Sequence, residues 1–262
     1  MKRTSAKNET GAGADTARLH AQLAAMYLTY VDQHFEGLGQ KAALDQSAHI
    51  DYLAQLIDGE SGRRADRSTE RRIALARLPV LKTLEQFDWS WAANINQMQI
   101  RHLFRLAFLE EKGNVIFIGG VGLGKSHLAT ALAHTACLQG HTALFTTAIG
   151  IINSLAAAQA SGGVKREMHK YLKPSVLVID ELGYLPIDKF GADCLFQVVS
   201  GRYEHSSTII TTNRAFKNWA EIFNNDSTLT SALLDRLLHH AETVLIEGKS
   251  YRMKEQIENL GV

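Results

Sequence analysis

The stretch 114-NVIFIGGVGLGKSHLATALA-133 decides the fold. It starts with a six-residue apolar run, NVIFIG, which is too short for a helix and is typical of a buried strand. GGVGLGKS, residues 119–126, then matches the phosphate-loop pattern G-x-x-x-x-G-K-[ST]. The residues after the loop have the composition of a helix. Strand, loop and helix in this order predict a nucleotide-binding α/β domain.

The loop residues suit a nucleotide triphosphate. Glycines allow backbone N–H groups to turn inward onto phosphates, and the dipole of the following helix favours an anion. We expect Lys125 to reach the β and γ phosphates of ATP and Ser126 to hold Mg²⁺. The alternative is a chance glycine-rich turn, which the strand–loop–helix context disfavours. The predicted nucleotide-binding residues are Gly119, Gly120, Val121, Gly122, Leu123, Gly124, Lys125, Ser126 and His127.

Four more short apolar runs follow, and helical segments separate them. Continuous apolar strands alternating with helices are typical of a parallel sheet covered on both faces. We therefore predict a five-stranded parallel sheet within a domain that spans residues 92–262. The four runs are TALFTT (142–147), SVLVID (175–180), STIITT (207–212) and TVLIE (243–247).

Polar residues end two of these strands. Asp180 follows four apolar residues and is predicted to orient Mg²⁺, while Glu181 beside it is predicted to act as the general base toward a water. Asn213 stands at the tip of the next strand, where an amide can orient that water between the γ phosphate and Glu181. Ligands bind at the carboxyl ends of strands in such sheets. Taken singly, an acidic pair could be merely solvated, and an asparagine could be a turn residue.

The first part of the chain has a different pattern. Residues 1–15 are predicted to be a flexible tail, and 16–78 an all-helical domain, because no proline precedes Pro79 and apolar residues recur at helical spacing. Gly37 and Gly39 suggest a turn between two helices. Residues 79–91 are predicted to be a linker. Trp89 and Trp91 in it lie either near the adenine or in a domain hinge.

Basic residues gather between positions 61 and 82, although the net charge of the whole chain is only +1. Arg63, Arg67 and Arg71 recur every four residues and share one helical face, which can follow a phosphate backbone. A solvated helix explains the charge equally well. A second basic group, with the same alternative, is Lys165, Arg166, Lys170 and Lys173.

The remaining composition narrows the setting. Cys137 and Cys194 lie far apart, so we expect no disulfide framework and a reducing compartment. The N-terminus has no apolar signal segment, and no apolar run is long enough to cross a membrane. The expected location is the cytoplasm, with no membrane partner.

LDRLLHH, residues 234–240, allows three hypotheses. Adjacent histidines on a helix point about 100° apart, so His239 and His240 are not expected to share a metal ion. Arg236 and Asp235 are also adjacent, and such neighbours pair poorly on a helix. The third hypothesis is that Arg236 projects toward a site outside its own chain.

The motifs GKSHLA, VLVIDELGYLP, STIITTN, LTSALLDRLLHH and GKSYRMK, in this order, resemble the AAA+ ATPases of the helicase-loader branch. Over residues 16–262 the chain is most similar to the IstB type, the helper ATPase of an insertion-sequence transposition system. GGVG in the loop departs from relatives that carry a proline there, and a glycine keeps the loop competent. Because the sequence ends soon after GKSYRMK, the resemblance implies a reduced helical lid.

The resemblance implies a mechanism and partners. Arg236 corresponds to the arginine finger that reaches the ATP of a neighbouring subunit, and Arg252 to a second sensor of the nucleotide state. The implied function is an ATPase that forms a homo-oligomer on duplex DNA, remodels it and recruits a transposase. A DnaC-like helicase loader, which would bind single-stranded DNA and a helicase, is the first alternative. A nucleotide-gated scaffold without turnover is the second.

Overall fold

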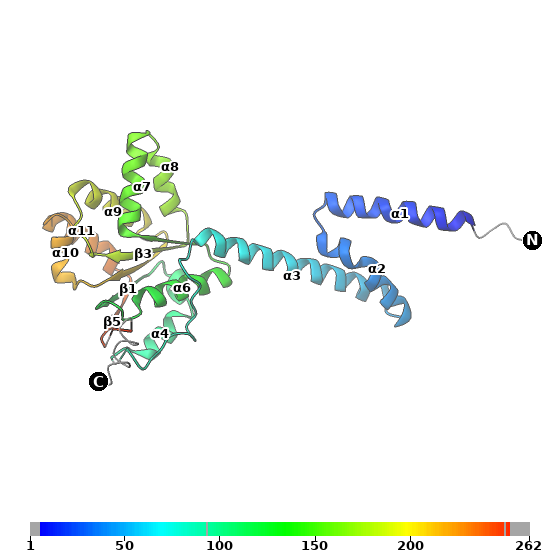
Figure 1. The fold of residues 1–262 in the computed structure, drawn as a ribbon, viewed down its shortest axis with the longest axis horizontal. Helices are drawn as coiled ribbons and strands as arrows, with labels where there is room; N and C mark the ends of the chain where they lie inside the picture. The colour runs from blue at the N-terminus through cyan, green and yellow to red at the C-terminus, as the bar shows by residue number, and fades with distance from the viewer. Residues whose placement is uncertain (1–5, 93, 249, 252–262) are drawn as a thin grey trace, which may run out of the picture. The chain divides into compact units, whose positions relative to one another are not determined.

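The computed structural model describes residues 6–92, 94–248 and 250–251. The chain divides into two compact units, Met1–Glu70 and Arg71–Val262, and the division falls inside one long helix (Figure 1). This boundary precedes residues 79–91, where the sequence predicted a linker. No helix in the described ranges has both the length and the apolar composition needed to cross a membrane.

The N-terminal unit is helical, as predicted. It contains α1 (Ala6–Ala25), α2 (Thr29–Leu44) and the first part of α3 (His49–Ala76). Helix α1 begins inside the stretch 1–15 for which the sequence predicted a tail, because this proline-free segment continues the helix that follows it. The predicted turn at Gly37 and Gly39 is wrong: both lie within α2, and the chain turns after Leu44 instead.

The second unit is built on the predicted five-stranded parallel sheet. Its strand order is β2-β3-β4-β1-β5, so β4 lies between the loop strand β1 and the acidic strand β3. The observed strands are β1 (Asn114–Gly119), β2 (Ala143–Thr147), β3 (Val176–Leu182), β4 (Ser207–Thr212) and β5 (Ala241–Ile246).

Helices cover both faces of this sheet (Figure 1). Successive residues of β1 show why, because Val115 and Phe117 enter one apolar core while Ile116 and Ile118 enter the other. α4 (Gln97–Leu103), α5 (Ala107–Glu110) and α6 (Lys125–Leu138) contribute to the first core. The second core contains residues of α7 (Ala148–Ala160), α8 (Val164–Leu172), α9 (Lys189–Arg202), α10 (Trp219–Ile222) and α11 (Ser227–Leu238), with the short 3-10 helix η1 (Phe216–Asn218) packed against it.

Side-chain caps define where several of these helices begin. The Asp188 carboxylate accepts a hydrogen bond from the Gly191 N–H at 2.8 Å, and the Asp226 carboxylate accepts one from the Leu229 N–H at 2.9 Å. Such caps satisfy N–H groups that have no partner within the helix. Asp188 and Asp226 end the segments that follow β3 and β4, at the carboxyl edge of the sheet, where the candidate site lies.

Candidate nucleotide-binding site

The phosphate loop joins β1 to α6 in the predicted way. Gly122 and Gly124 have φ angles of +76° and +85°, which side chains with a Cβ rarely adopt. A Cβ on Gly124 would also lie only 2.5 Å from the Phe87 ring. The loop therefore needs glycine at these positions for its backbone path and for the close packing of an aromatic ring.

Lys125 begins α6 and is held inside the loop. Its side chain is buried, and Nζ donates a hydrogen bond to the Gly120 carbonyl oxygen at 2.6 Å. An ammonium group held beside the N-terminus of a helix provides positive charge where phosphates bind. The position fits the predicted contact with the β and γ phosphates.

The Asp180 carboxylate on β3 accepts hydrogen bonds from hydroxyl groups of two other elements. The Ser126 hydroxyl of α6 donates to Asp180 Oδ1 at 2.8 Å, and the Thr211 hydroxyl of β4 donates to the same oxygen. The Asp180 side chain is buried at the carboxyl end of β3. Oxygen ligands of this kind suit Mg²⁺, so Ser126 and Asp180 fit the metal site that the sequence predicted. Sequence reasoning missed Thr211, whose only signal was its place at the end of a strand.

Glu181 is oriented differently from its neighbour. The register between β3 and β4 shifts between Ile179 and Leu182, and Glu181 has a φ angle of +61°. Its N–H donates to the Thr211 hydroxyl at 3.0 Å, which fixes this bulge, while its side chain is exposed. Bulges redirect side chains next to active sites. Two adjacent carboxylates thus have separate environments, one buried in a hydroxyl cluster and the other at the cavity.

A cavity of about 270 Å³ opens beside the loop, and Glu181 lines it. The Phe87 and Trp91 rings contribute to its wall, as do Tyr184 and Tyr251. Trp91, one of the two tryptophans that the sequence placed either near the adenine or in a hinge, thus lines the cavity beside the phosphate loop. Trp89 instead packs edge-on against Phe87, with ring centroids 4.9 Å apart, and against the core. Sequence reasoning also missed these polar lining residues: Lys82, Gln86 and Asp88.

His127 connects the loop helix to this wall. Its Nε2 lies 2.9 Å from the Thr83 carbonyl oxygen, and its ring meets Phe87 edge-on. Burial lowers the pKa of the His127 imidazole, and the positive charge of Lys82 acts in the same direction. At neutral pH the ring is therefore an uncharged packing group, which stabilises the segment 82–92 against the loop.

Asn213 directly follows β4 and carries an orphaned polar atom. Its Oδ1 is buried and has no hydrogen-bond partner in the ranges that the structure describes. Buried polar atoms are nearly always paired, so an exception calls for a ligand or a water. This observation fits the role predicted for Asn213.

Arg236 lies on α11 and does not line the cavity of its own chain. Its guanidinium donates to the Ala232 carbonyl oxygen at 2.7 Å and stacks over the Phe196 ring at 5.0 Å from the centroid. Within the described residues no ion pair joins it to Asp235. Arg252, the predicted second sensor, and the expected reduced lid lie outside the described residues.

The predicted DNA-contact residues differ in what their side chains meet. On α3, Arg67 and Arg71 are exposed, while Arg63 donates to Gln33 Oε1 at 2.6 Å. On α8, Lys165 and Arg166 are exposed. Lys170 forms an ion pair with Glu167 at 2.7 Å, and Lys173 is exposed after the helix.

The structure corrects the prediction about the adjacent histidines. Helix α11 ends at Leu238, so His239 and His240 do not follow one another along a regular helix. Their ring centroids are only 4.1 Å apart. The expectation that neighbouring side chains on a regular helix point about 100° apart therefore does not apply to His239 and His240.

Comparisons with known proteins identify the family of this chain. Residues 21–259 match the sequence model of a family described as IstB-like ATP binding protein. The ATP-binding protein of insertion sequence IS21 from Pseudomonas aeruginosa is 38% identical over 238 residues, covering 91% of this chain and 89% of that protein. The corresponding protein of IS5376 from Geobacillus stearothermophilus is 35% identical over 239 residues, covering 91% of this chain and 95% of that protein.

Solved structures show the same fold. The crystal structure of the DnaC helicase loader has a TM-score of 0.50 and 24% identity, covering 57% of this chain and 87% of that one. AMPPCP-bound DnaA from Aquifex aeolicus has a TM-score of 0.53 and 18% identity, and the match covers 71% of this chain and 57% of that one. The second unit therefore has the AAA+ P-loop fold that the sequence predicted.

Proposed function

This chain belongs to the family of IstB-like ATP binding proteins, and from that premise we propose that it is an ATP-hydrolysing helper of an insertion-sequence transposase. It assembles on duplex DNA, remodels it and recruits the transposase. The curated relatives are named as ATP-binding proteins of insertion sequences, which supports the setting.

The observation that supports hydrolysis is that the two adjacent carboxylates, Asp180 and Glu181, lie in different environments. Asp180 accepts hydrogen bonds from Ser126 and Thr211, so it is committed to the buried cluster. Glu181 faces the cavity on a bulge and can accept a proton from an attacking water. Mg²⁺ bound by Ser126 and Asp180 would neutralise charge on the phosphates.

The remaining loop residues position the substrate. The Lys125 ammonium offsets the charge on the β and γ phosphates, and loop N–H groups cradle them. The orphaned Oδ1 of Asn213 accepts a hydrogen bond from the water that Glu181 activates. In this scheme the chain binds the triphosphate in the cavity and keeps its base next to the aromatic wall.

Arg236 completes the site from a neighbouring copy. It lies outside the cavity of its own chain, and a fixed positive charge at the γ phosphate stabilises the charge that develops in the transition state. The active sites are therefore at interfaces between subunits of a homo-oligomer. Arg252 is proposed to sense the nucleotide state.

The duplex contact is proposed for the basic residues of α3 and α8, namely Arg63, Arg67, Arg71, Lys165, Arg166 and Lys170. Contacts to phosphates give weak sequence preference and strong salt dependence. Lys170 is the weakest of these candidates, because Glu167 already pairs with it. We also place the protein in the cytoplasm, because Cys137 and Cys194 are unpaired thiols in two separate cores.

Sedimentation tests the proposal most directly. The full chain is run with a non-hydrolysable ATP analogue and with duplex or single-stranded DNA, and a Lys125→Ala variant serves as the nucleotide control. A large assembly that needs nucleotide and prefers the duplex is the expected result. Preference for single strands, or assembly only with a helicase, would favour the loader. A phosphate-release assay separates both from a scaffold without turnover.

A further inference from the structure

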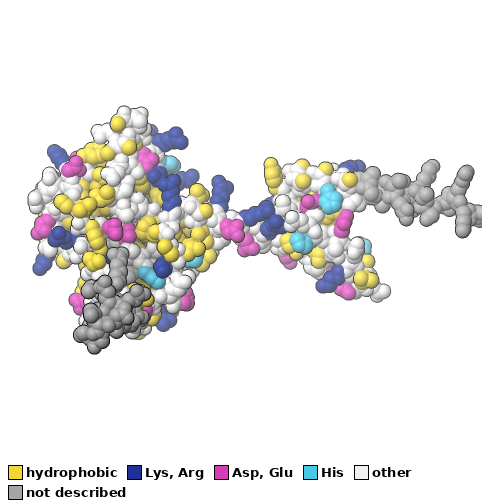
Figure 2. All heavy atoms as spheres, viewed as in Figure 1, with side chains coloured by type: hydrophobic (Ala, Val, Ile, Leu, Met, Phe, Trp, Pro, Cys, Tyr) yellow, Lys and Arg dark blue, Asp and Glu magenta, His cyan; other side chains and the backbone are white. Residues whose placement is uncertain are grey.

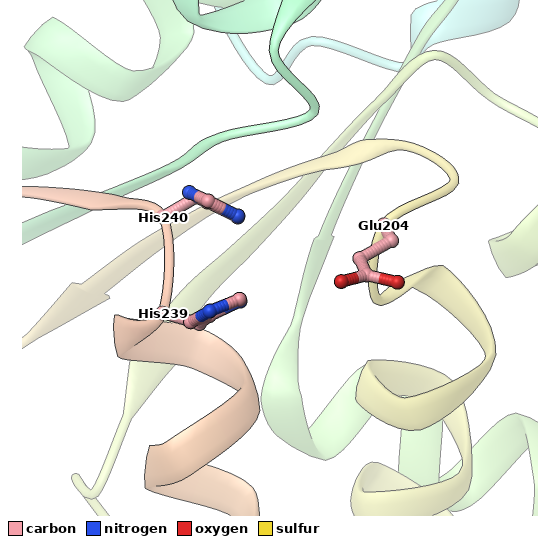
Figure 3. A group of neighbouring side chains, drawn as sticks. All are labelled: Glu204, His239 and His240. Carbon is pink, nitrogen blue, oxygen red and sulfur yellow. The ribbon is translucent and has the colours of Figure 1, made fainter.

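Two turns at the amino edge of the sheet bring three metal-ligating side chains together. Glu204 follows α9, while His239 and His240 lie between α11 and β5. Figure 3 shows both imidazole rings and the Glu204 carboxylate turned toward the same space. Each residue offers one ligand atom, and these atoms all lie within 4.8 Å of one another. All three side chains are exposed, so an ion could enter from solvent.

This cluster is separate from the nucleotide site. Glu204 lies just before β4 begins at Ser207, and His240 directly precedes β5, which begins at Ala241. The strands are parallel, so both turns lie at their amino ends. The phosphate loop and Glu181 lie at the opposite, carboxyl edge. Any ion held here is therefore distinct from the Mg²⁺ proposed beside the ATP phosphates.

Backbone hydrogen bonds fix both turns. The Asn114 N–H of β1 donates to the His240 carbonyl oxygen at 2.6 Å, and the Asn114 side chain donates to the Leu237 carbonyl oxygen at 3.0 Å. On the other side, the His205 N–H donates to the Arg202 carbonyl oxygen at 3.0 Å. The ligands thus stand on anchored backbone, which reduces the conformational entropy lost on binding.

A neighbouring side chain orients one of the rings. The Tyr203 hydroxyl lies 2.9 Å from His239 Nδ1. When Nδ1 carries the proton and donates to this oxygen, Nε2 is left with a free lone pair to bind a metal. Metal-binding histidines generally have such a partner on the second ring nitrogen. Glu204 also has a φ angle of +60°, an uncommon backbone conformation for a residue with a side chain, and its carboxylate is directed toward the two rings (Figure 3).

We propose that Glu204, His239 and His240 form a surface site for one divalent transition-metal ion of the Zn²⁺ class. Imidazole nitrogens suit Zn²⁺, Co²⁺, Ni²⁺ and Cu²⁺, whereas Mg²⁺ prefers oxygen ligands and several waters. Ligands at about 2.0–2.2 Å from zinc lie roughly 3.3–3.6 Å apart in a tetrahedral site. The three ligand atoms here lie within 4.8 Å of one another, so binding would require the side chains to rotate closer together. Three protein ligands leave one position open to water.

The bound ion would connect α9 to α11. Arg236 lies three residues before His239 and stacks over Phe196 of α9, so it belongs to the same pair of helices. A metal bridge between their ends would restrict the movement of α11. The metal site itself does not depend on the ATPase function proposed above.

Titration with Co²⁺ tests the site. The full chain, without a polyhistidine tag and stripped of metal, is titrated in excess Mg²⁺ and without nucleotide. Visible absorption follows Co²⁺, and calorimetry follows Zn²⁺ alone. The expected result is one equivalent bound, with affinity at least tenfold lower in His239→Ala, His240→Ala and Glu204→Gln. His205→Ala, which removes an exposed histidine next to Glu204, is the matched control and is expected to bind as the unchanged protein does.

Two further measurements keep the test decisive. Melting curves in EDTA identify any variant that fails to fold, and Tyr203→Phe, which removes only a hydroxyl, is expected to weaken binding by about tenfold. Binding that is equal in all variants and in His205→Ala would overturn the proposal. Weak binding without saturation at one equivalent would overturn it as well.

Discussion

The two units of this chain bury apolar side chains to very different extents. The second unit has one apolar core on each face of its sheet, whereas the buried apolar cluster among the described residues of the N-terminal unit consists of Leu23, Val31 and Leu56. Hydrophobic side chains are visible on the surface of the N-terminal unit (Figure 2). The large exposed ones are Leu19, Met26, Tyr27, Leu44, Ile50, Leu53 and Ile57.

The difference shows that helices with a similar apolar periodicity pack in different ways in the two units. In the N-terminal unit, a buried carboxylate on α3 binds α2: Glu60 accepts hydrogen bonds from the N–H groups of Tyr30 and Val31 at 2.8 and 3.3 Å. The Tyr52 hydroxyl also donates to the Phe35 carbonyl oxygen at 2.9 Å. Specific polar contacts therefore add to a small apolar cluster in this unit, whereas the other unit has two extended apolar cores.

The largest expected effect concerns the proposed ATP hydrolysis in the second unit. Arg236→Ala is expected to retain ATP binding and to lose about 10³-fold in hydrolysis, because the transition state loses a fixed positive charge. Phosphate release and binding of a fluorescent ATP analogue measure the two steps. Unchanged turnover would contradict the finger assignment.

Mixing variants shows whether this arginine acts between subunits. Glu181→Gln subunits supply an intact Arg236, and Arg236→Ala subunits supply an intact Glu181. If the arginine serves a neighbouring site, mixtures of the two inactive proteins are expected to recover part of the activity. No recovery in assembled mixtures would place Arg236 in its own site.

A second change targets the packing of the second unit. Arg202 is almost fully buried, and its guanidinium donates to the carbonyl oxygens of Tyr171, Pro174 and Ser207 at 2.7, 3.0 and 2.5 Å. Arg202→Met removes all of these hydrogen bonds from a buried site, so we expect a loss of about 3 kcal/mol in the free energy of unfolding. Urea unfolding followed by tryptophan fluorescence reports this unit specifically, because Trp89, Trp91 and Trp219 all lie in it.

The matched control for that experiment is Arg166→Met, which removes an exposed arginine on α8. Its unfolding curve is expected to stay within about 0.5 kcal/mol of the unchanged protein. Equal effects of the two substitutions would show that the buried hydrogen bonds contribute little.

A smaller effect is expected in the N-terminal unit. Burial would raise the pKa of the Glu60 carboxyl, but the N–H groups of Tyr30 and Val31, together with Arg64, outweigh it and lower this pKa. Ionised Glu60 therefore stabilises the unit above the ordinary carboxyl pKa of 4.5, and this contribution is lost as the pH falls through the lower folded value. Glu60→Gln is expected to cost about 1–2 kcal/mol at pH 7.

Circular dichroism and tryptophan fluorescence together locate this change. Helical signal is expected to fall at lower denaturant in Glu60→Gln while the tryptophan transition stays in place. Glu70→Gln, which alters an exposed carboxylate on the same helix, is the control. A shift in both transitions would mean that the two units unfold together.

The smallest expected effect concerns DNA affinity. Arg67→Ala is expected to weaken duplex binding about equally for all sequences and to reduce the salt slope by about 1, because one phosphate contact is lost. Fluorescence anisotropy over a salt series measures both quantities. Lys41→Ala, an exposed lysine of α2, is the control; an equal change there would indicate that only net charge matters.

The sequence alone determined the parts of this protein that depend on local pattern. Strands β1 and β4 have the predicted bounds, and the phosphate loop lies between β1 and α6 as expected. Asp180 follows a buried apolar run at the carboxyl end of a strand, so its location was also predictable. Short apolar runs, glycine-rich turns and helical periodicity reflect interactions between residues close in sequence, which is why they can be recognised without tertiary contacts.

Only the tertiary structure decided which distant residues meet. It brought Thr211 to Asp180, placed Phe87 and Trp91 in the wall of the cavity, and redirected Glu181 through a bulge. It also left many regularly spaced apolar residues of the N-terminal unit exposed and brought the ring centroids of His239 and His240 to 4.1 Å from each other. Periodicity specifies the face of a helix but not what covers it, because burial and side-chain direction depend on long-range packing.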